Sequence, residues 1–192
     1  SKKLSTGQLN TVKEALRLAP SSYGAQPFKY VIVENPEVRE KLVEHSWNQQ
    51  QIKDASHLFV LCYDKNGLSE AGIDGFMKLV AETRGQDIAD LKGYRDLVLN
   101  TSNALSDGDK ETWQSKQLYI ALGQLMTVCA LEDIDTCPME GFVSDKYDEV
   151  LGLNEKGLKS VVIIPVGFRA EDDGYAHLPK VRKPRAEMFE VI

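Results

Sequence analysis

Basic side chains crowd one short segment near the carboxyl end of an otherwise acidic chain. Lys180 and Arg182 stand two residues apart, with a proline on either side of the segment and two further cations at Lys183 and Arg185. On an extended backbone, side chains at this spacing lie on one side, where an ammonium and a guanidinium group can bind one phosphate together. We interpret the segment as a candidate phosphate site; the alternative is a solvated tail, which most charge runs are.

A small polar loop offers a second candidate. Residues 20–27 are bounded by prolines and include Pro20, Ser21 and Ser22 between a predicted helix and a predicted strand. Hydroxyls and free backbone N–H groups in such a loop can bind the edge of a ligand. The same composition is also typical of a simple turn.

Two further pairs carry groups that form hydrogen bonds. Asn48 and Gln51 are three residues apart, which predicts that their amides share one face of a short helix. Glu140 and Gly141 follow a proline in a tight polar turn that leaves a predicted extended segment. Exposure to solvent for the first pair and a structural turn for the second are the competing interpretations.

The usual signatures of protein-borne catalysis are missing from the sequence. It has no glycine-rich dinucleotide or phosphate-binding loop and no nucleophile elbow around a serine. The histidines, His45, His57 and His177, are too far apart for a metal-binding motif. We therefore expect no metal and no catalytic side chain of the common types. If the protein is an enzyme, a bound cofactor carries the chemistry.

Composition narrows the class of protein. The 192 residues carry 23 Lys and Arg against 29 Asp and Glu, a net charge of −6, and we expect one domain over residues 1–192. An acidic chain gains little from counterion release, which argues against nucleic acid as a partner. No apolar run approaches the roughly 18 residues that span a bilayer, so no membrane partner is expected.

Cys62 and Cys129 lie in apolar runs, which predicts buried free thiols in the reducing cytoplasm.

Hydrophobic periodicity predicts strands and helices intermixed along the chain, hence an α+β or α/β domain with helices on both faces of one sheet. Thr6 is expected to cap the first helix. From Leu118 to Leu131 one helix is apolar almost all round, so it is either a central core helix or a subunit interface. Strands are predicted at 28–34, 57–63 and 158–168, with an extended segment at 135–138 and an edge strand at 187–192. The first predicted helix starts at residue 6. Further helices are predicted at 36–46, 47–55, 69–84, 86–105, 110–132 and 144–151.

Five segments in order along the chain resemble the FMN-dependent NAD(P)H nitroreductase family, in particular its oxygen-insensitive nitroreductase and dihydropteridine reductase branch. The similarity spans essentially the whole chain. No single motif identifies the family, but all five in the family's order and spacing are specific for it. They are APSS with QPF at 19–28, KDASH at 53–57, PMEGF at 138–142, VVIIPVG at 161–167 and LPKVR at 178–182.

The resemblance implies an α+β fold in which helices flank a mixed central β-sheet. It further implies an intertwined homodimer with two FMN molecules at the subunit interface, and a carboxyl-terminal segment that extends the partner's sheet. The helix that is apolar on all sides and the strand-like tail agree with this arrangement.

The resemblance also implies roles for the candidate residues. Lys180 and Arg182 would bind the FMN phosphate, and Asn48 and Gln51 the edge of the flavin ring. The backbone of Glu140 and Gly141 would donate near flavin N5, so the Glu140 side chain would matter less than its N–H. Pro20, Ser21 and Ser22 would come from the other subunit.

One departure from the family pattern concerns the start of the chain. Family members have an N-terminal helix and an Arg-x-Ser/Thr-x-Arg/Lys segment that also contacts FMN, and the present sequence matches only from a point after it. Either that segment lies upstream of Ser1 or the protein lacks half of its phosphate clamp. The second case would weaken FMN binding by about tenfold or more per lost charge-assisted hydrogen bond.

Three hypotheses for function follow from the resemblance. The first is an oxidoreductase that transfers hydride from NAD(P)H through FMN to nitroaromatics, quinones or similar acceptors by a ping-pong mechanism. The second is a dihydropteridine or flavin reductase on the same fold. The third is a flavin-binding protein without catalysis.

Overall fold

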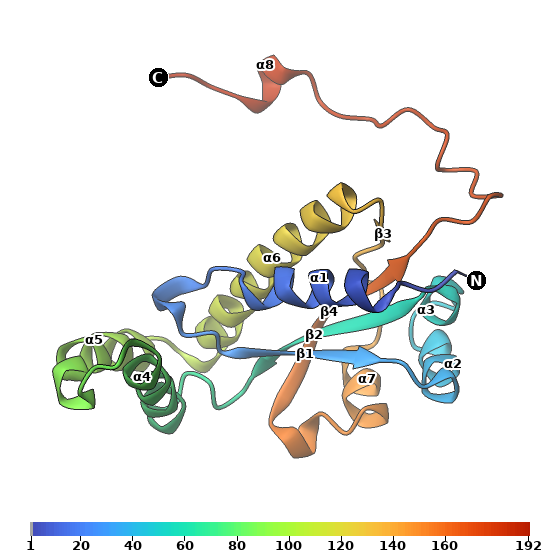
Figure 1. Ribbon diagram of the computed structural model, residues 1–192. Helices are drawn as coiled ribbons and strands as arrows, with labels where there is room; N and C mark the ends of the chain where they lie inside the picture. Colours follow the sequence, from blue (N-terminus) through green and yellow to red (C-terminus); the bar gives the residue numbers. More distant parts are fainter. Residues whose placement is uncertain (1) are drawn as a thin grey trace.

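A computed structural model describes residues 2–192, and a four-stranded sheet stands at its centre (Figure 1). The strands lie in the order β1-β2-β4-β3, and every neighbouring pair is antiparallel. The α+β class is thus confirmed, while the parallel pairing of a mixed sheet is not seen within one chain. The strands are β1 (Phe28–Val33), β2 (His57–Asp64), β3 (Asp135–Thr136) and β4 (Leu158–Gly167).

Strand β2 lies between β1 and β4 and has six consecutive buried residues from Leu58 to Tyr63. Helices cover both faces of the sheet, so both sets of alternating side chains are apolar. Phe59 and Leu61 pack under α1 (Thr6–Arg17) and α6 (Asp107–Leu131). On the opposite face, Leu58, Val60 and Cys62 meet α2 (Pro36–Glu44), α3 (Gln51–Asp54) and α7 (Ser144–Val150).

A helical hairpin extends from one end of this sandwich (Figure 1). It consists of α4 (Glu70–Arg84) and α5 (Lys92–Asn103), joined through a 3-10 turn at Ile88–Leu91. Its small core includes Ile73, Met77 and Val98, and it is separate from the two cores of the sheet.

Capping serines differ from the sequence predictions at two helices. Ser5, and not Thr6, caps α1, with Gln8 completing a capping box. Ser106 accepts a hydrogen bond from the Asp109 N–H, so α6 begins three residues before the predicted Lys110. In both cases a hydroxyl one or a few residues upstream satisfies the free N–H groups of the first turn.

Helix α6 buries one face and exposes the other. Leu118, Leu122 and Leu125 are buried in the core, whereas Tyr119, Ile120 and Leu131 are exposed in the single chain. No helix in the described part of the chain has the length and apolar character that crossing a membrane requires.

The carboxyl-terminal segment leaves the body after β4 and runs apart from it (Figure 1). Its helix, α8 (Arg185–Met188), includes the first two residues of the edge strand predicted at 187–192. Residues 189–192 pair with no strand of their own chain, and Phe189 and Val191 are exposed. The edge strand is therefore wrong for the isolated chain, because the segment contacts no sheet edge there.

Candidate functional site

The turn at residues 140–142 is pinned at both ends by backbone hydrogen bonds. Before it, Met139 pairs with Ile163 of β4: the Met139 N–H donates to the Ile163 carbonyl over 2.8 Å, and the reverse bond is 3.1 Å. After it, the Val143 N–H donates to the His45 carbonyl over 2.8 Å. The turn is thus fixed between the sheet and the end of α2.

Two consecutive backbone donors in this turn are free. Among residues 2–192, neither the Glu140 N–H nor the Gly141 N–H has an acceptor. Adjacent N–H groups without a partner in a fixed turn can donate to a ligand that carries oxygen or nitrogen acceptors.

Gly141 lies in contact with the indole of Trp47, so a side chain here would displace that ring. A Cβ on Gly141 would lie 2.7 Å from Cζ3 of Trp47, closer than carbon atoms approach. Trp47 and Asn48 both have left-handed backbone conformations, with φ of 53° and 57°, which brings the chain sharply round to the turn. Trp47 itself is 73% exposed.

Asn48 and Gln51 lie beside the turn but do not share a helix face. Because Asn48 is left-handed, it precedes the helix, and α3 begins only at Gln51; the prediction of one helical face was wrong. The side-chain nitrogen of Gln51 donates to Oε1 of the Gln49 side chain over 2.7 Å and lies 3.9 Å from the Met139 sulfur. The segment 47–51 and the turn therefore form one cluster.

Tyr119 of α6 joins the same cluster, and sequence reasoning missed it. Its hydroxyl donates a hydrogen bond to Oε1 of Glu140. Burial, followed by the contact with Glu140, raises the pKa of Tyr119 to about 12. The one available signal was a polar aromatic residue within the apolar stretch of α6, which by itself indicates packing rather than a site.

The loop with Pro20, Ser21 and Ser22 lies elsewhere in the single chain. It follows α1 at the end nearer the helical hairpin, whereas α3 lies at the opposite end (Figure 1). The Ser22 N–H donates to Gln117 Oε1 over 2.8 Å, and Ser21 Oγ accepts from the Gln26 N–H over 3.1 Å. The loop is ordered by its own chain without reaching the turn.

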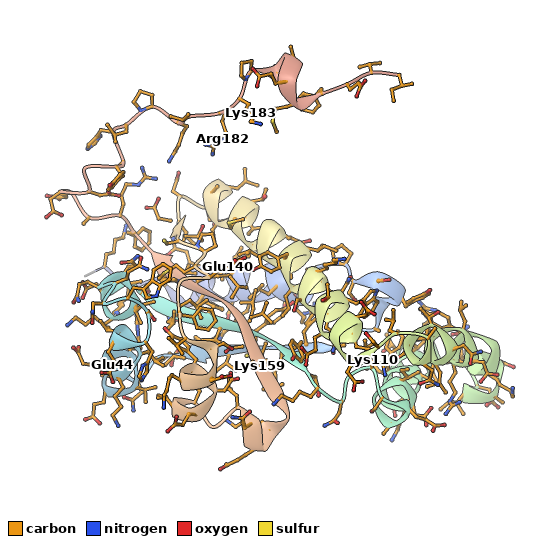
Figure 2. The ribbon with its side chains drawn as sticks, turned by 180° about the vertical axis from the view of Figure 1, so that it is seen from behind. Glu44, Lys110, Glu140, Lys159, Arg182 and Lys183 are labelled. Atoms are coloured by element: carbon orange, nitrogen blue, oxygen red, sulfur yellow. The ribbon has the colours of Figure 1, made fainter. Side chains whose placement is uncertain are left out.

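Lys180 and Arg182 lie on the outlying carboxyl-terminal segment. Figure 2 shows Arg182 and Lys183 on this segment, well apart from Glu140 in the body. Lys180 is exposed, and among residues 2–192 the Arg182 guanidinium donates only to the neighbouring Val181 carbonyl, over 2.8 Å. The single chain therefore assembles the ring-edge candidates but not the phosphate candidates.

An antiparallel sheet between two helical layers defines an α+β protein, and the turn at residues 140–142 carries two backbone donors without an acceptor in the described chain. The model of the nitroreductase family matches residues 1–168, so this chain belongs to the nitroreductase family. The resemblance found in the sequence is thereby confirmed.

Relatives and solved structures agree with this assignment. YfkO of Bacillus subtilis, provisionally named an NAD(P)H nitroreductase, is 37% identical over 183 residues, covering 90% of this chain and 82% of its own length. A protein of Staphylococcus haemolyticus with the same provisional name is 32% identical over 200 residues, covering 100% and 89%. A provisionally named nitroreductase of Exiguobacterium sibiricum, solved in complex with FMN, has a TM-score of 0.82 at 20% identity, covering 100% and 89%.

Proposed function

We propose that this protein is an FMN-dependent oxidoreductase that transfers hydride from NAD(P)H to nitroaromatics, quinones or similar acceptors in a ping-pong sequence. The observation that carries the proposal is the pair of free N–H groups at Glu140 and Gly141 beside the amides of Asn48 and Gln51. A family whose relatives are named for NAD(P)H, and a solved structure of the same fold in complex with FMN, support it.

The donor set around the turn fits the edge of an isoalloxazine ring. Such an edge offers carbonyl oxygens and ring nitrogens, and the turn offers two backbone donors. Asn48 and Gln51 add amides that both donate and accept. When bound, FMN would supply the hydride chemistry; the turn would stabilise negative charge near N5 through fixed donors.

The phosphate and the far side of the ring need groups that the single chain places elsewhere. We propose that Lys180 and Arg182 bind the phosphate, and that Pro20, Ser21 and Ser22 of a second copy line the ring. The exposed face of α6, with Tyr119, Ile120 and Leu131, would form part of the homodimer interface. An apolar face of this kind is stabilised when another surface covers it.

Spectroscopy of the purified protein tests the function. Protein reconstituted with FMN is expected to be yellow, to lose its visible band when NADH or NADPH is added without oxygen, and to regain it with a quinone or a nitrofuran. If the visible band returns only with a pteridine or a free flavin, that compound is the acceptor in place of nitroaromatics and quinones. A yellow protein that neither coenzyme bleaches would contradict catalysis, and failure to bind FMN would contradict the whole proposal.

A further inference from the structure

The carboxylate of Glu140 has one partner, and it comes from a different element. The Tyr119 hydroxyl donates to Oε1 of Glu140, and within the described chain Glu140 forms no ion pair. The residue is exposed, and an exposed carboxylate without such a contact would be free to move in water. The hydrogen bond instead fixes it relative to α6.

This contact falls beside the two backbone donors of the turn that have no acceptor in the described chain. The bonds of Met139 and Val143 hold the ends of the turn, but Glu140 and Gly141 themselves donate to nothing in the described chain. Between the two ends, the Phe142 N–H donates to the Glu140 carbonyl over 2.8 Å, and two side chains add to this bond: the Trp47 ring lies against Gly141, and Tyr119 holds the Glu140 carboxylate.

The hydroxyl is suited to constant donation. Burial and the neighbouring carboxylate raise the pKa of Tyr119 to about 12, so the phenol keeps its proton throughout the neutral range. A protonated phenol donates to a carboxylate, which is one of the stronger hydrogen bonds in proteins. Tyr119 is 39% exposed, so it stands at the rim of the cluster and not in the core.

We propose that Tyr119 is a positioning residue for the FMN site. Through Glu140 it keeps the two free N–H groups in place and holds the carboxylate on the side of α6. Donors stabilise charge best when they are fixed before the ligand binds, and a carboxylate released near the ring would disfavour added negative charge there. The inference rests on the function proposed above.

The test compares FMN binding and flavin midpoint potential in matched variants. Tyr119→Phe is expected to raise the FMN dissociation constant about tenfold and to make the midpoint potential more negative. Glu140→Gln, which keeps an acceptor for the hydroxyl, is expected to retain FMN affinity. Tyr30→Phe is the control: its hydroxyl donates to the Leu16 carbonyl over 3.1 Å, away from the turn, and its loss should change neither quantity.

A second pair of variants guards against a purely structural effect. Glu140→Ala removes the same hydrogen bond from an exposed side chain, so it should lower FMN affinity without lowering the thermal stability of the apoprotein. The double variant with Tyr119→Phe should lose no more, because two residues that act through one bond are not additive. Additive losses, or affinity and potential unchanged in Tyr119→Phe, would overturn the inference. Wild-type protein that binds no FMN would instead refute the proposed function.

Discussion

Nε of Arg39 donates a hydrogen bond to the backbone carbonyl of Ile52 over 2.8 Å, although Arg39 is only 3% exposed. The same guanidinium reaches the carbonyls of Ala55 and Ser56 over 2.8 and 3.1 Å. The cation thus satisfies the carboxyl end of α3, where carbonyl groups lack helical partners. Arg39 thereby fixes the short helix that begins at the candidate residue Gln51.

Replacing this guanidinium should destabilise the fold. Arg39→Met is expected to lower the free energy of unfolding by about 2–4 kcal/mol, because buried carbonyls lose charge-assisted donors. Urea unfolding at neutral pH measures the loss. Lys53→Met is the control: it removes a surface cation 3.1 Å from Glu40 and should change stability by less than about 1 kcal/mol. Equal effects of the two substitutions would contradict the role given to Arg39.

The strands were predictable because their signal is local. The run from His57 to Tyr63 is apolar at nearly every position, as a strand covered on both faces must be, and β2 has nearly the predicted bounds. The same holds for β1 and β4, whose β-branched residues favour extended backbone. The buried face of α6 was not predictable in the same way, because a helix that is apolar almost all round gives no clear period; the fold shows that Leu118, Leu122 and Leu125 lie on it.

The candidate site depends on contacts that periodicity does not specify. Tyr119 and Glu140 are 21 residues apart, and Ser22 and Gln117 are 95 apart, so only the folded chain brings each pair together. Spacing alone placed Asn48 on a helix. The residue types do not indicate that Trp47 and Asn48 both have left-handed backbone conformations. For Lys180 and Arg182, residue types and spacing indicated a phosphate site and the family resemblance indicated the phosphate of FMN; both remain predictions.

Two glycines of α4 should respond to alanine in opposite ways. A Cβ on Gly75 meets nothing within 4 Å, so Gly75→Ala should raise the free energy of unfolding by about 0.5–1 kcal/mol through helix propensity. A Cβ on Gly72 would lie 2.4 Å from the Asn66 carbonyl oxygen, so Gly72→Ala should be destabilising by about 2 kcal/mol or more. Thermal unfolding of both variants checks the sign; the same sign for both would be incompatible with this packing.

Thiol reactivity should separate the three cysteines. Burial raises the pKa of Cys62 to about 12 and that of Cys129 to about 11, whereas Cys137 is exposed. Because the thiolate is the reactive form, a thiol reagent at neutral pH should label Cys137 rapidly in native protein and the other two only after unfolding. Mass spectrometry of labelled peptides reads this directly. Fast labelling that persists in Cys137→Ser would show that a buried thiol is accessible.

The basic tail permits a test that separates a specific phosphate contact from general attraction. Lys180→Ala with Arg182→Ala removes the proposed pair, whereas Lys183→Ala with Arg185→Ala removes the same two charges at the same spacing three residues further on. Loss of charge-assisted hydrogen bonds of about 1.5–3 kcal/mol each should weaken FMN binding at least tenfold in the first variant.

The second variant should lose much less, because it loses only screened long-range attraction to the phosphate. Fluorescence titration of FMN into each apoprotein gives the dissociation constants, and gel filtration shows whether the oligomeric state is kept. Comparable losses of FMN affinity in both variants would show that the segment acts only through its general positive charge. An unchanged FMN affinity in the first variant would show that Lys180 and Arg182 do not bind the phosphate. A larger salt dependence in wild type than in the first variant is expected as well, because the direct ionic contacts are present only there.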